Sequence, residues 1–488
     1  MMLEQLRANT RKRGNHSALV QGSICLSYND MWRLVDHYAK ILKHYKLGKG
    51  DIIGLIAPNA IENAIIYLSI WEIKAVPYPF GEYNDFLRCL LASDEAPKAI
   101  LIYKPWINID LSHTLKQYYL QLLSITQSGL TLYVKSAQNR FNNNNLGNET
   151  FVWLSSSGTT GESKIIKLGL HGTLANIRAN VESLCLCEDD CTLMCLPMRY
   201  SYGLIGQFLS HLYVGSKIVF PIRINLIHTI PILIRQQQIT TMFTVPTLLR
   251  SLITVLSNIQ DVKASMSSLR LLTVGGGAID KYWLQRALDL LKDTAIAVTY
   301  GLTEAGPRVS TYIVQENPFY IGSVGRPIKG VEVAIVDYQG NELSYNQQGE
   351  IVVFSASVMQ GYAFNSGEKD YIPGKMLYTS DRGYVSKDGY IYILGRNCEL
   401  ININGNQIYF NELKEFLYSD SNILHVEIEP VSSENETLLV LHIVPKPGKK
   451  LNKAVPQMIA TNCKFSSLLD KIDIKFGHCL KANKKCSV

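Results

Sequence analysis

Apolar and polar positions alternate along the first eighty residues as they do in strands and helices of α/β proteins. Two short apolar runs, 18–20 and 26–28, flank a turn and predict a hairpin. Apolar residues at helical spacing predict a long amphipathic helix over 29–45. A buried strand over 52–56 and a helix over 60–71 follow. This alternation of strand, helix and strand favours a parallel sheet covered by helices.

The same kind of pattern continues to residue 395. Helices are expected over 205–213 and 227–238, and short strand-like runs alternate with turn residues over 321–395. The predicted fold class is therefore α/β, with parallel sheets covered by helices and a β-rich subdomain. Further strands are expected over 99–103, 151–154, 165–168, 217–220, 271–274, 331–336 and 390–394.

Composition indicates a folded chain that is too long for one ordinary domain. Of its 488 residues, 47% are hydrophobic and 18% are charged, which excludes a disordered protein. The net charge of +7 suits anionic cofactors such as ATP, so nucleic acid is not an expected partner. No apolar run reaches the roughly eighteen residues of a membrane span, and the N-terminus lacks the apolar core of a signal peptide. We therefore expect a cytoplasmic protein.

The cysteines fit reduced thiols in such a compartment. Cys185, Cys187, Cys191 and Cys195 lie close together in sequence, which raises the question of a metal site. Their spacing is not a paired Cys-x-x-Cys, and no histidine lies close by. We interpret them as small apolar residues around a strand.

A stretch of small residues follows the strand predicted over 151–154. Glycines let a backbone turn tightly and bring its N–H groups close to a ligand, while hydroxyl groups and a lysine add donors and positive charge. A flexible linker has a similar composition, but apolar segments flank the stretch directly, so we expect a turn inside a folded unit. The pattern favours a polyphosphate site, although it lacks the adjacent Gly-Lys-Ser/Thr of a Walker loop. Its members are Ser156, Ser157, Gly158, Thr159, Thr160, Gly161 and Lys164.

Two further segments suit a nucleotide. Gly275, Gly276 and Gly277 follow the strand predicted over 271–274, where three glycines let a flat ring lie against bare backbone, although a tight turn needs glycine too. Residues 300–304 read Tyr-Gly-Leu-Thr-Glu. In this segment the tyrosine offers a ring face, the threonine a donor, and the glutamate the kind of oxygen that Mg²⁺ prefers.

Together these segments resemble the adenylate-forming superfamily, which contains acyl-CoA synthetases, luciferases and adenylation domains. The superfamily's phosphate loop reads Ser/Thr-Ser-Gly-Thr-Thr-Gly-x-Pro-Lys, and residues 156–164 fit it except that Ser163 stands where proline is usual. Residues 300–304 resemble its Tyr-Gly-x-Thr-Glu motif, and residues 379–383 its Thr-x-Asp-x-Gly motif. The resemblance covers nearly the whole chain, about residues 1–485.

The resemblance implies a role for each matching residue. Asp381 and Arg396 would hold the ribose, and Glu304 would bind Mg²⁺. Tyr200 lies in a segment similar to the superfamily's Pro-x-x-His-x-x-Gly motif and would lie near the bound carboxylate, unless it is a core aromatic at a helix start. The implied catalytic residues are Lys164, Tyr200, Thr303, Glu304 and Lys485. The implied nucleotide-binding residues are Ser156, Ser157, Gly158, Thr159, Thr160, Gly161, Lys164, Gly275, Gly276, Gly277, Tyr300, Gly301, Thr303, Asp381 and Arg396.

The C-terminal part departs from the superfamily's pattern. The resemblance places a hinge at Cys398, which divides the chain into a large domain over 1–396 and a small mobile α+β domain over 397–488. Asn402 stands where a lysine that helps the second half-reaction is usual.

The tail is the second departure. The resemblance assigns the adenylation lysine to Lys485. Lys481 and Lys484 compete for this role, and all three could equally form a solvated basic tail.

The function that the resemblance implies is ATP-dependent activation of a small carboxylic acid to an acyl-adenylate. The acyl group then passes to a thiol, which is CoA or the phosphopantetheine of a carrier protein. Two alternatives stay open: direct amide formation with an amine, and a nucleotide-binding protein without catalysis. No acidic residue lies between Asp190 and Asp261, which counts against an α-amino acid substrate. A pocket formed by Tyr200, Tyr202, Val245 and Thr247 suggests an aryl or medium apolar acid.

Overall fold

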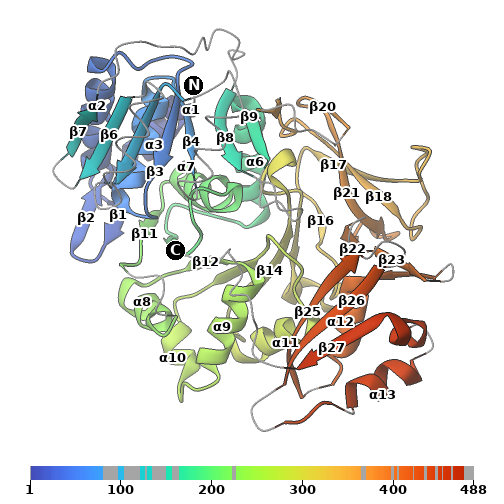
Figure 1. The fold of residues 1–488 in the computed structure, drawn as a ribbon. Helices are drawn as coiled ribbons and strands as arrows, with labels where there is room; N and C mark the ends of the chain where they lie inside the picture. The colour runs from blue at the N-terminus through green and yellow to red at the C-terminus, as the bar shows by residue number, and fades with distance from the viewer. Residues whose placement is uncertain are drawn as a thin grey trace.

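The computed structural model describes most of the chain, and the fold is mixed α/β as predicted (Figure 1). The phosphate loop before Lys164, the hinge residue Cys398 and the tail lysine Lys485 lie outside the described residues. The described residues are 2–80, 97–103, 121–126, 129–134, 150–155, 164–222, 227–363, 370–396, 400–403, 406–420, 422–432, 437–445, 449–452, 454–462 and 465–476.

The first sheet contains five strands in the order β4-β3-β5-β6-β7. All neighbours run parallel except β7, which is antiparallel to β6. Helix α2 begins where Ser27 and Asp30 form a capping box, because the Ser27 Oγ accepts from the Asp30 N–H at 3.1 Å. The bounds are β3 Ile52–Ile56, β4 Val76–Pro79, β5 Ala99–Tyr103, β6 Gln121–Thr126, β7 Gly129–Val134, α1 Met2–Thr10, α2 Tyr28–His44 and α3 Ile61–Glu72.

The central sheet has nine strands in the order β16-β15-β14-β13-β12-β10-β11-β1-β2. The strands from β14 to β1 are parallel, and their central members are buried on both faces. One face packs on α8, α9 and α11, and the other on α6, η3 and α7. The strands are β1 Ser17–Gln21, β2 Ile24–Ser27, β10 Cys191–Leu193, β11 Lys217–Val219, β12 Thr241–Thr244, β13 Leu271–Val274, β14 Ala295–Tyr300, β15 Ser310–Ile313 and β16 Arg326–Pro327. The helices are α6 Leu170–Ser183, η3 Tyr202–Leu209, α7 Ser210–Val214, α8 Thr229–Gln237, α9 Pro246–Leu256, α10 Val262–Met266, α11 Lys281–Leu290 and η4 Thr303–Ala305.

Two smaller antiparallel sheets complete the main body. In one, β8 Thr150–Ser155 and β9 Ile165–Gly169 form a hairpin around the predicted phosphate loop, and β19 Gly361–Tyr362 joins β9. The prediction that this loop is a turn inside a folded unit concerns residues 156–163, which lie outside the described residues. The other sheet is the predicted β-rich stretch, with the strands β17 Val331–Val336, β18 Gly349–Ser355, β20 Tyr371–Ile372, β21 Met376–Val385 and β22 Ile391–Arg396.

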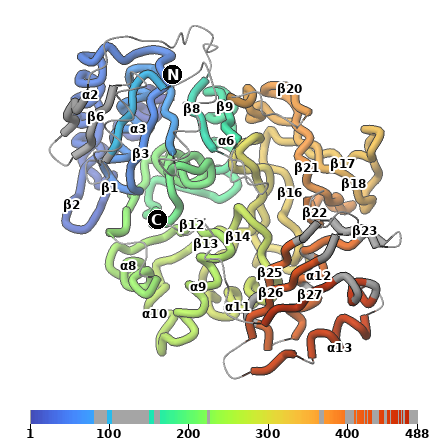
Figure 2. The backbone as a smooth tube through the Cα atoms, viewed as in Figure 1, coloured from blue at the N-terminus to red at the C-terminus, as the bar shows by residue number. Residues whose placement is uncertain are grey.

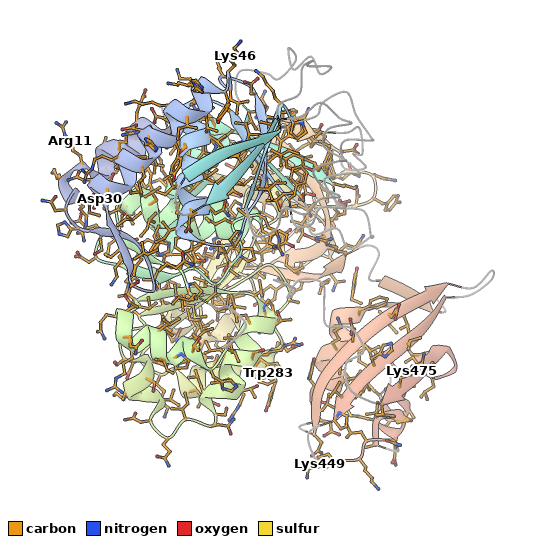
Figure 3. All side chains as sticks on the ribbon, turned by 60° about the vertical axis from the view of Figure 1, so that its left-hand side comes forward. Arg11, Asp30, Lys46, Trp283, Lys449 and Lys475 are labelled. Atoms are coloured by element: carbon orange, nitrogen blue, oxygen red, sulfur yellow. The ribbon has the colours of Figure 1, made fainter. Side chains whose placement is uncertain are left out.

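The described residues between 400 and 476 form sheets and a hydrophobic core of their own. This group lies at the red end of the tube in Figure 2, and in Figure 3 it carries Lys449 and Lys475, while Trp283 lies on the central-sheet body. It contacts that body where the Arg250 guanidinium lies 6.0 Å from the Tyr418 ring. The exact boundary after residue 396 stays a prediction. The elements are β23 Leu400–Ile403, β24 Asn406–Tyr409, α12 Phe410–Leu417, β25 Ile423–Ser432, β26 Thr437–Pro445, α13 Ala454–Thr461 and β27 Ile472–Phe476.

The helix expected over 205–213 begins three residues earlier, so that prediction is wrong at its start. A π-helix, η3, begins at Tyr202 and continues directly into α7. The early start depends on Gly203, because a Cβ there would overlap the Pro197 carbonyl oxygen. π-Helical turns are rare and often lie at functional sites.

Candidate active site at the carboxyl ends of the parallel strands

Three of the predicted segments meet at one edge of the central sheet. β12, β13 and β14 are parallel neighbours, so the segments that follow Thr244, Val274 and Tyr300 emerge side by side. The carboxyl ends of parallel strands are where open α/β sheets bind ligands. The glycine segment and the Tyr-Gly-Leu-Thr-Glu segment therefore lie together, as the sequence motifs require.

Tyr300, Asp381 and Arg396 form one hydrogen-bonded cluster. The Tyr300 hydroxyl donates to Asp381 Oδ2 at 2.6 Å, and Arg396 Nε donates to Oδ1 at 3.2 Å. Asp381 and Arg396 are direct partners in the β21–β22 ladder, and Asp381 is only 6% exposed. Burial and the charge of Asp381 raise the pKa of Tyr300 well above its ordinary value, so its hydroxyl stays a donor. The cluster presents a carboxylate, a guanidinium and a ring at the end of β14.

Thr303 and Glu304 lie three and four residues after Tyr300 on the same segment. The Thr303 and Ser201 hydroxyl oxygens are 3.0 Å apart, which joins η4 to the start of η3. Glu304 is buried, and its carbonyl oxygen accepts from the Met359 N–H at 2.8 Å. Residues 359–363 then continue into β19, which pairs with β9.

That pairing brings the lysine of the predicted phosphate loop to the same region. Lys164 immediately precedes β9, and its Nζ lies 5.6 Å from the centre of the Tyr362 ring. Tyr362 is the last residue of β19. Lys164 and Glu304 therefore come from segments that the 359–363 chain holds next to each other.

The glycine segment forms a bare wall beside Tyr202. A Cβ at Gly275 would overlap Thr299 Oγ1 and lie 3.3 Å from Tyr202 Cζ, and Gly276 has a φ of +72°. The positions therefore require glycine both for space and for backbone conformation. The Tyr202 hydroxyl lies 2.7 Å from Thr273 Oγ1, which fixes the ring against this wall.

Polar side chains hold η3 and α7 in register on the central sheet. Gln207 Nε2 donates to Thr192 Oγ1 at 2.9 Å, one turn after Tyr202. His211 is fully buried, with Nδ1 2.8 Å from the Gln207 carbonyl oxygen and Nε2 2.8 Å from Thr241 Oγ1. A carbonyl only accepts, so Nδ1 carries the proton and Nε2 accepts from the threonine. Burial lowers the pKa of His211 to about 4, so the helix that begins with Tyr202 rests on a neutral histidine.

Tyr200 lies just before this helix. Its ring is 4.9 Å from the Arg199 guanidinium carbon, and its carbonyl oxygen accepts from the Leu204 N–H at 2.9 Å. The side chain is half-buried, two residues from Tyr202 and one from Ser201, so it comes from the segment that contacts Thr303. A position near a bound carboxylate stays a prediction.

Comparison with known proteins adds to this geometry. The family model described as "AMP-binding enzyme" matches residues 6–363. The chain belongs to this family.

Its relatives and structural neighbours are ligases. It is similar to a probable CoA ligase, CCL5, from Humulus lupulus, with 26% identity over 448 residues, which are 88% of this chain and 80% of the relative. Its fold matches that of an o-succinylbenzoate coenzyme A synthetase from Bacillus subtilis solved with ATP and magnesium ion, with a TM-score of 0.78 at 19% identity over 97% of this chain and 95% of the other. It also matches the amide bond synthetase McbA from Marinactinospora thermotolerans, with a TM-score of 0.82 at 17% identity over 99% and 97%.

The cysteine cluster of this AMP-binding enzyme fits the apolar interpretation only in part. Cys185 and Cys187 are exposed, so the interpretation is wrong for these two. Cys191 and Cys195 are buried, and burial raises the pKa of Cys191 to about 11 and that of Cys195 to about 12. Both are therefore protonated thiols at neutral pH. Among the described residues, no group of three or more His, Cys, Asp and Glu side chains is placed to hold a metal ion.

Within the described ranges, no helix combines the length and the apolar character needed to cross a bilayer. The cytoplasmic location stays a prediction.

Sequence reasoning missed two residues near the site. Ser201 precedes η3 and contacts Thr303, and Arg308 follows the Tyr-Gly-Leu-Thr-Glu segment and is fully buried. The sequence does contain a signal that Arg308 is unusual, since this charged residue stands between Pro307 and Val309 in an otherwise apolar and small stretch. Its burial is a tertiary property that the pattern does not reveal.

Proposed function

We propose that this AMP-binding enzyme activates a carboxylic acid with ATP and then transfers the acyl group to a thiol. In the first step a carboxylate oxygen attacks the α-phosphorus, which forms the acyl-adenylate and releases pyrophosphate. In the second step the thiol sulfur attacks the acyl carbon, the bond to AMP breaks, and the thiol proton is released. The acceptor is CoA or the phosphopantetheine of a carrier protein.

One observation carries this proposal. Tyr300, which hydrogen-bonds Asp381 of the Tyr300–Asp381–Arg396 cluster, and the Thr303–Glu304 pair lie within five residues of one segment at the carboxyl edge of the central sheet. That spacing suits the ribose and the α-phosphate of one nucleotide. A buried carboxylate such as Asp381 accepts hydrogen bonds from both hydroxyls of a ribose.

The remaining groups would place the triphosphate and the acid. The loop that ends at Lys164 would donate N–H and hydroxyl groups to the β- and γ-phosphates. Thr303 would donate to the α-phosphate, and Tyr200 would lie beside the attacking carboxylate. Glu304 fits a magnesium site because it is a buried carboxylate beside the proposed phosphates. Bound Mg²⁺ would neutralise phosphate charge, while the protein supplies position and hydrogen-bond donors.

The tail and the acceptor remain part of the proposal. Lys485 would approach the α-phosphate from a C-terminal domain over 397–488 that rotates about Cys398 between the half-reactions. Lys485→Ala is then expected to lose adenylation but to keep thioester formation from added acyl-adenylate. Equal loss of both activities would contradict this assignment.

The test is acid-dependent exchange of labelled pyrophosphate into ATP, over a panel of aryl, aliphatic and amino acids. Exchange with at least one acid, abolished by EDTA, would support the first step. CoA, phosphopantetheinylated carrier and simple amines would then be added separately. A thioester product supports the thiol acceptor, and an amide formed from an amine but no thioester would favour the alternative. If ATP binds in calorimetry but no acid promotes exchange, the protein is a nucleotide-binding homologue without this activity.

A further inference from the structure

A buried arginine lies beside the acid pocket with two of its nitrogens unpaired. Arg308 has 0% exposure. Its Nε donates to Asn180 Oδ1 at 2.7 Å, and its carbonyl oxygen accepts from Asn176 Nδ2 at 2.7 Å. Its Nη1 and Nη2 have no hydrogen-bond partner among the described residues. The backbone and Nε are thus fixed, while Nη1 and Nη2 are buried with no hydrogen-bond acceptor among the described residues.

The charge of this guanidinium is also unbalanced. The described part of the chain gives Arg308 no carboxylate as an ion-pair partner. Burial lowers the pKa of Arg308, and Tyr202 is the neighbour that opposes this shift. An unpaired buried charge is costly, and buried arginines are normally paired with carboxylates or phosphates. An anion that binds here would supply the missing partner.

The position of Arg308 connects it to the proposed acid site. Its guanidinium carbon lies 5.4 Å from the centre of the Tyr202 ring, the ring that packs against the Gly275 wall. A Cβ at Gly301 would overlap the Pro307 carbonyl oxygen and lie 2.9 Å from the backbone nitrogen of Arg308. The backbone before the arginine therefore lies directly against the segment that carries Thr303.

A row of neighbouring side chains thus leads from the proposed phosphate site toward the buried Arg308. Thr303 contacts Ser201, the next residue is Tyr202, and Arg308 lies against the Tyr202 ring. An acid whose reactive carboxylate lies at Thr303 would extend along Tyr202 toward Arg308.

We propose that Arg308 binds a second carboxylate at the far end of the substrate, so that this enzyme activates a dicarboxylic acid. The open Nη1 and Nη2 present a fork that matches the two oxygens of a carboxylate. The Tyr202 hydroxyl, which lies 2.7 Å from Thr273 Oγ1, would be a second donor to that carboxylate. This inference rests on the proposed adenylation function and adds the class of acid.

A purely structural arginine would act differently. The Nε bond to Asn180 supports η3, because Asn180 Nδ2 donates to the Gly206 carbonyl oxygen at 2.9 Å and lies 2.9 Å from Ser210 Oγ. That role needs only Nε and would affect all acids equally. A receptor role instead changes the preference between acids that differ only in the second carboxylate.

The experiment compares matched pairs of acids in pyrophosphate exchange. The pairs are butyrate with succinate, hexanoate with adipate, and benzoate with phthalate, isophthalate and terephthalate. For the wild type we expect kcat/KM for one diacid to exceed that for its monoacid by at least about 100-fold, because a site built for a charged partner rejects the analogue that lacks it. Arg308→Met should reduce this ratio to about one, because the loss of the Nε bond lowers both rates by the same factor and only the diacid also loses its partner.

Two further variants keep the test clear. Arg308→Lys retains the charge without the fork and should recover part of the preference. Arg326→Met is the matched control, because Arg326 also lies over an aromatic ring, 4.7 Å from the Tyr390 centre, but on the surface. It should leave the diacid preference unchanged.

The outcomes separate this inference from the proposed function. If monoacids are activated as well as diacids, or if Arg308→Met lowers both rates equally while near-UV circular dichroism shows an intact fold, the receptor role is wrong and adenylation stands. If Arg308→Met does not fold, the wild-type ratio and the Arg308→Lys ratio still decide the matter. If no acid of either kind promotes exchange, the proposed function fails and the diacid inference fails with it.

Discussion

The ribose assignment can be tested by removing one charge. Asp381→Asn keeps the shape of the side chain and one carbonyl oxygen for the Tyr300 hydroxyl, but it removes the ion pair with Arg396. Hydrogen bonds to a charged group contribute about 1.5 to 3 kcal/mol. Loss of such a bond to a ribose hydroxyl would therefore weaken nucleotide binding by about 10- to 140-fold.

The assay is calorimetric titration with AMP, 2′-deoxy-AMP and 3′-deoxy-AMP. In the wild type, removal of either hydroxyl should weaken binding by at least about tenfold. In Asp381→Asn, loss of either ribose hydroxyl should weaken binding by less than about threefold, because the charged acceptor is already absent. The control is Asp293→Asn. It removes the charge of an exposed aspartate that pairs with Lys263 and lies just before the first residue of β14, at the end of the strand away from Tyr300.

If Asp381 binds the ribose hydroxyls, Asp381→Asn must abolish most of the penalty that each deoxy analogue shows with the wild type. If the variant binds AMP weakly but keeps the full wild-type penalty for each deoxy analogue, Asp381 does not contact the ribose. Thermal unfolding of each variant shows whether the loss of the Arg396 partner has disturbed the fold instead.

Three further predictions follow from the same geometry. Gly275→Ala should lower acid-dependent exchange by more than about tenfold, since its Cβ would overlap Thr299 Oγ1, and wild-type exchange in the variant would contradict the proposed wall. Glu304→Gln should raise the Mg²⁺ concentration for half-maximal exchange by about tenfold or more, and an unchanged magnesium titration would remove Glu304 from the metal site. His211 has a folded pKa of about 4 below its unfolded value of 6.5, so its stabilising effect is full above pH 6.5 and is lost as pH falls toward 4. Urea unfolding should show about 2 kcal/mol lost between pH 7.5 and 5 from this group, and His211→Gln should lack that loss, whereas identical pH profiles would contradict it.

Sequence reasoning predicted one strand in each of three sheets well for a physical reason. The strands over 52–56, 271–274 and 331–336 have the expected bounds, because continuous or alternating apolar runs end abruptly at turn residues. Parallel pairing then places the ends of such strands at one edge, so motifs far apart in sequence meet there. The joint location of Gly275 and Tyr300 therefore followed from the pattern.

Side-chain partners were not predictable in the same way. The bond from Tyr300 to Asp381 joins two sheets, and the start of η3 at Tyr202 depends on a close approach to the Pro197 carbonyl oxygen. The burial of Arg308 depends on the packing of α6, η3 and β15 around it. Local periodicity contains no information about such contacts. Tyr300 and Asp381 lie 81 residues apart, Arg308 and Asn180 lie 128 apart, and the start of η3 is set by a backbone approach at one glycine.

The most direct test of the central claim follows an oxygen atom. The acid whose exchange is strongest is labelled with ¹⁸O in its carboxylate and incubated with ATP, magnesium and a thiol acceptor, and the AMP is analysed by mass spectrometry. If the carboxylate attacks the α-phosphorus, one ¹⁸O atom of the acid passes into each AMP released by the thiol. AMP that carries no label would mean that water, and not the acid, attacks the nucleotide, and it would contradict the account of this enzyme as an adenylate-forming ligase.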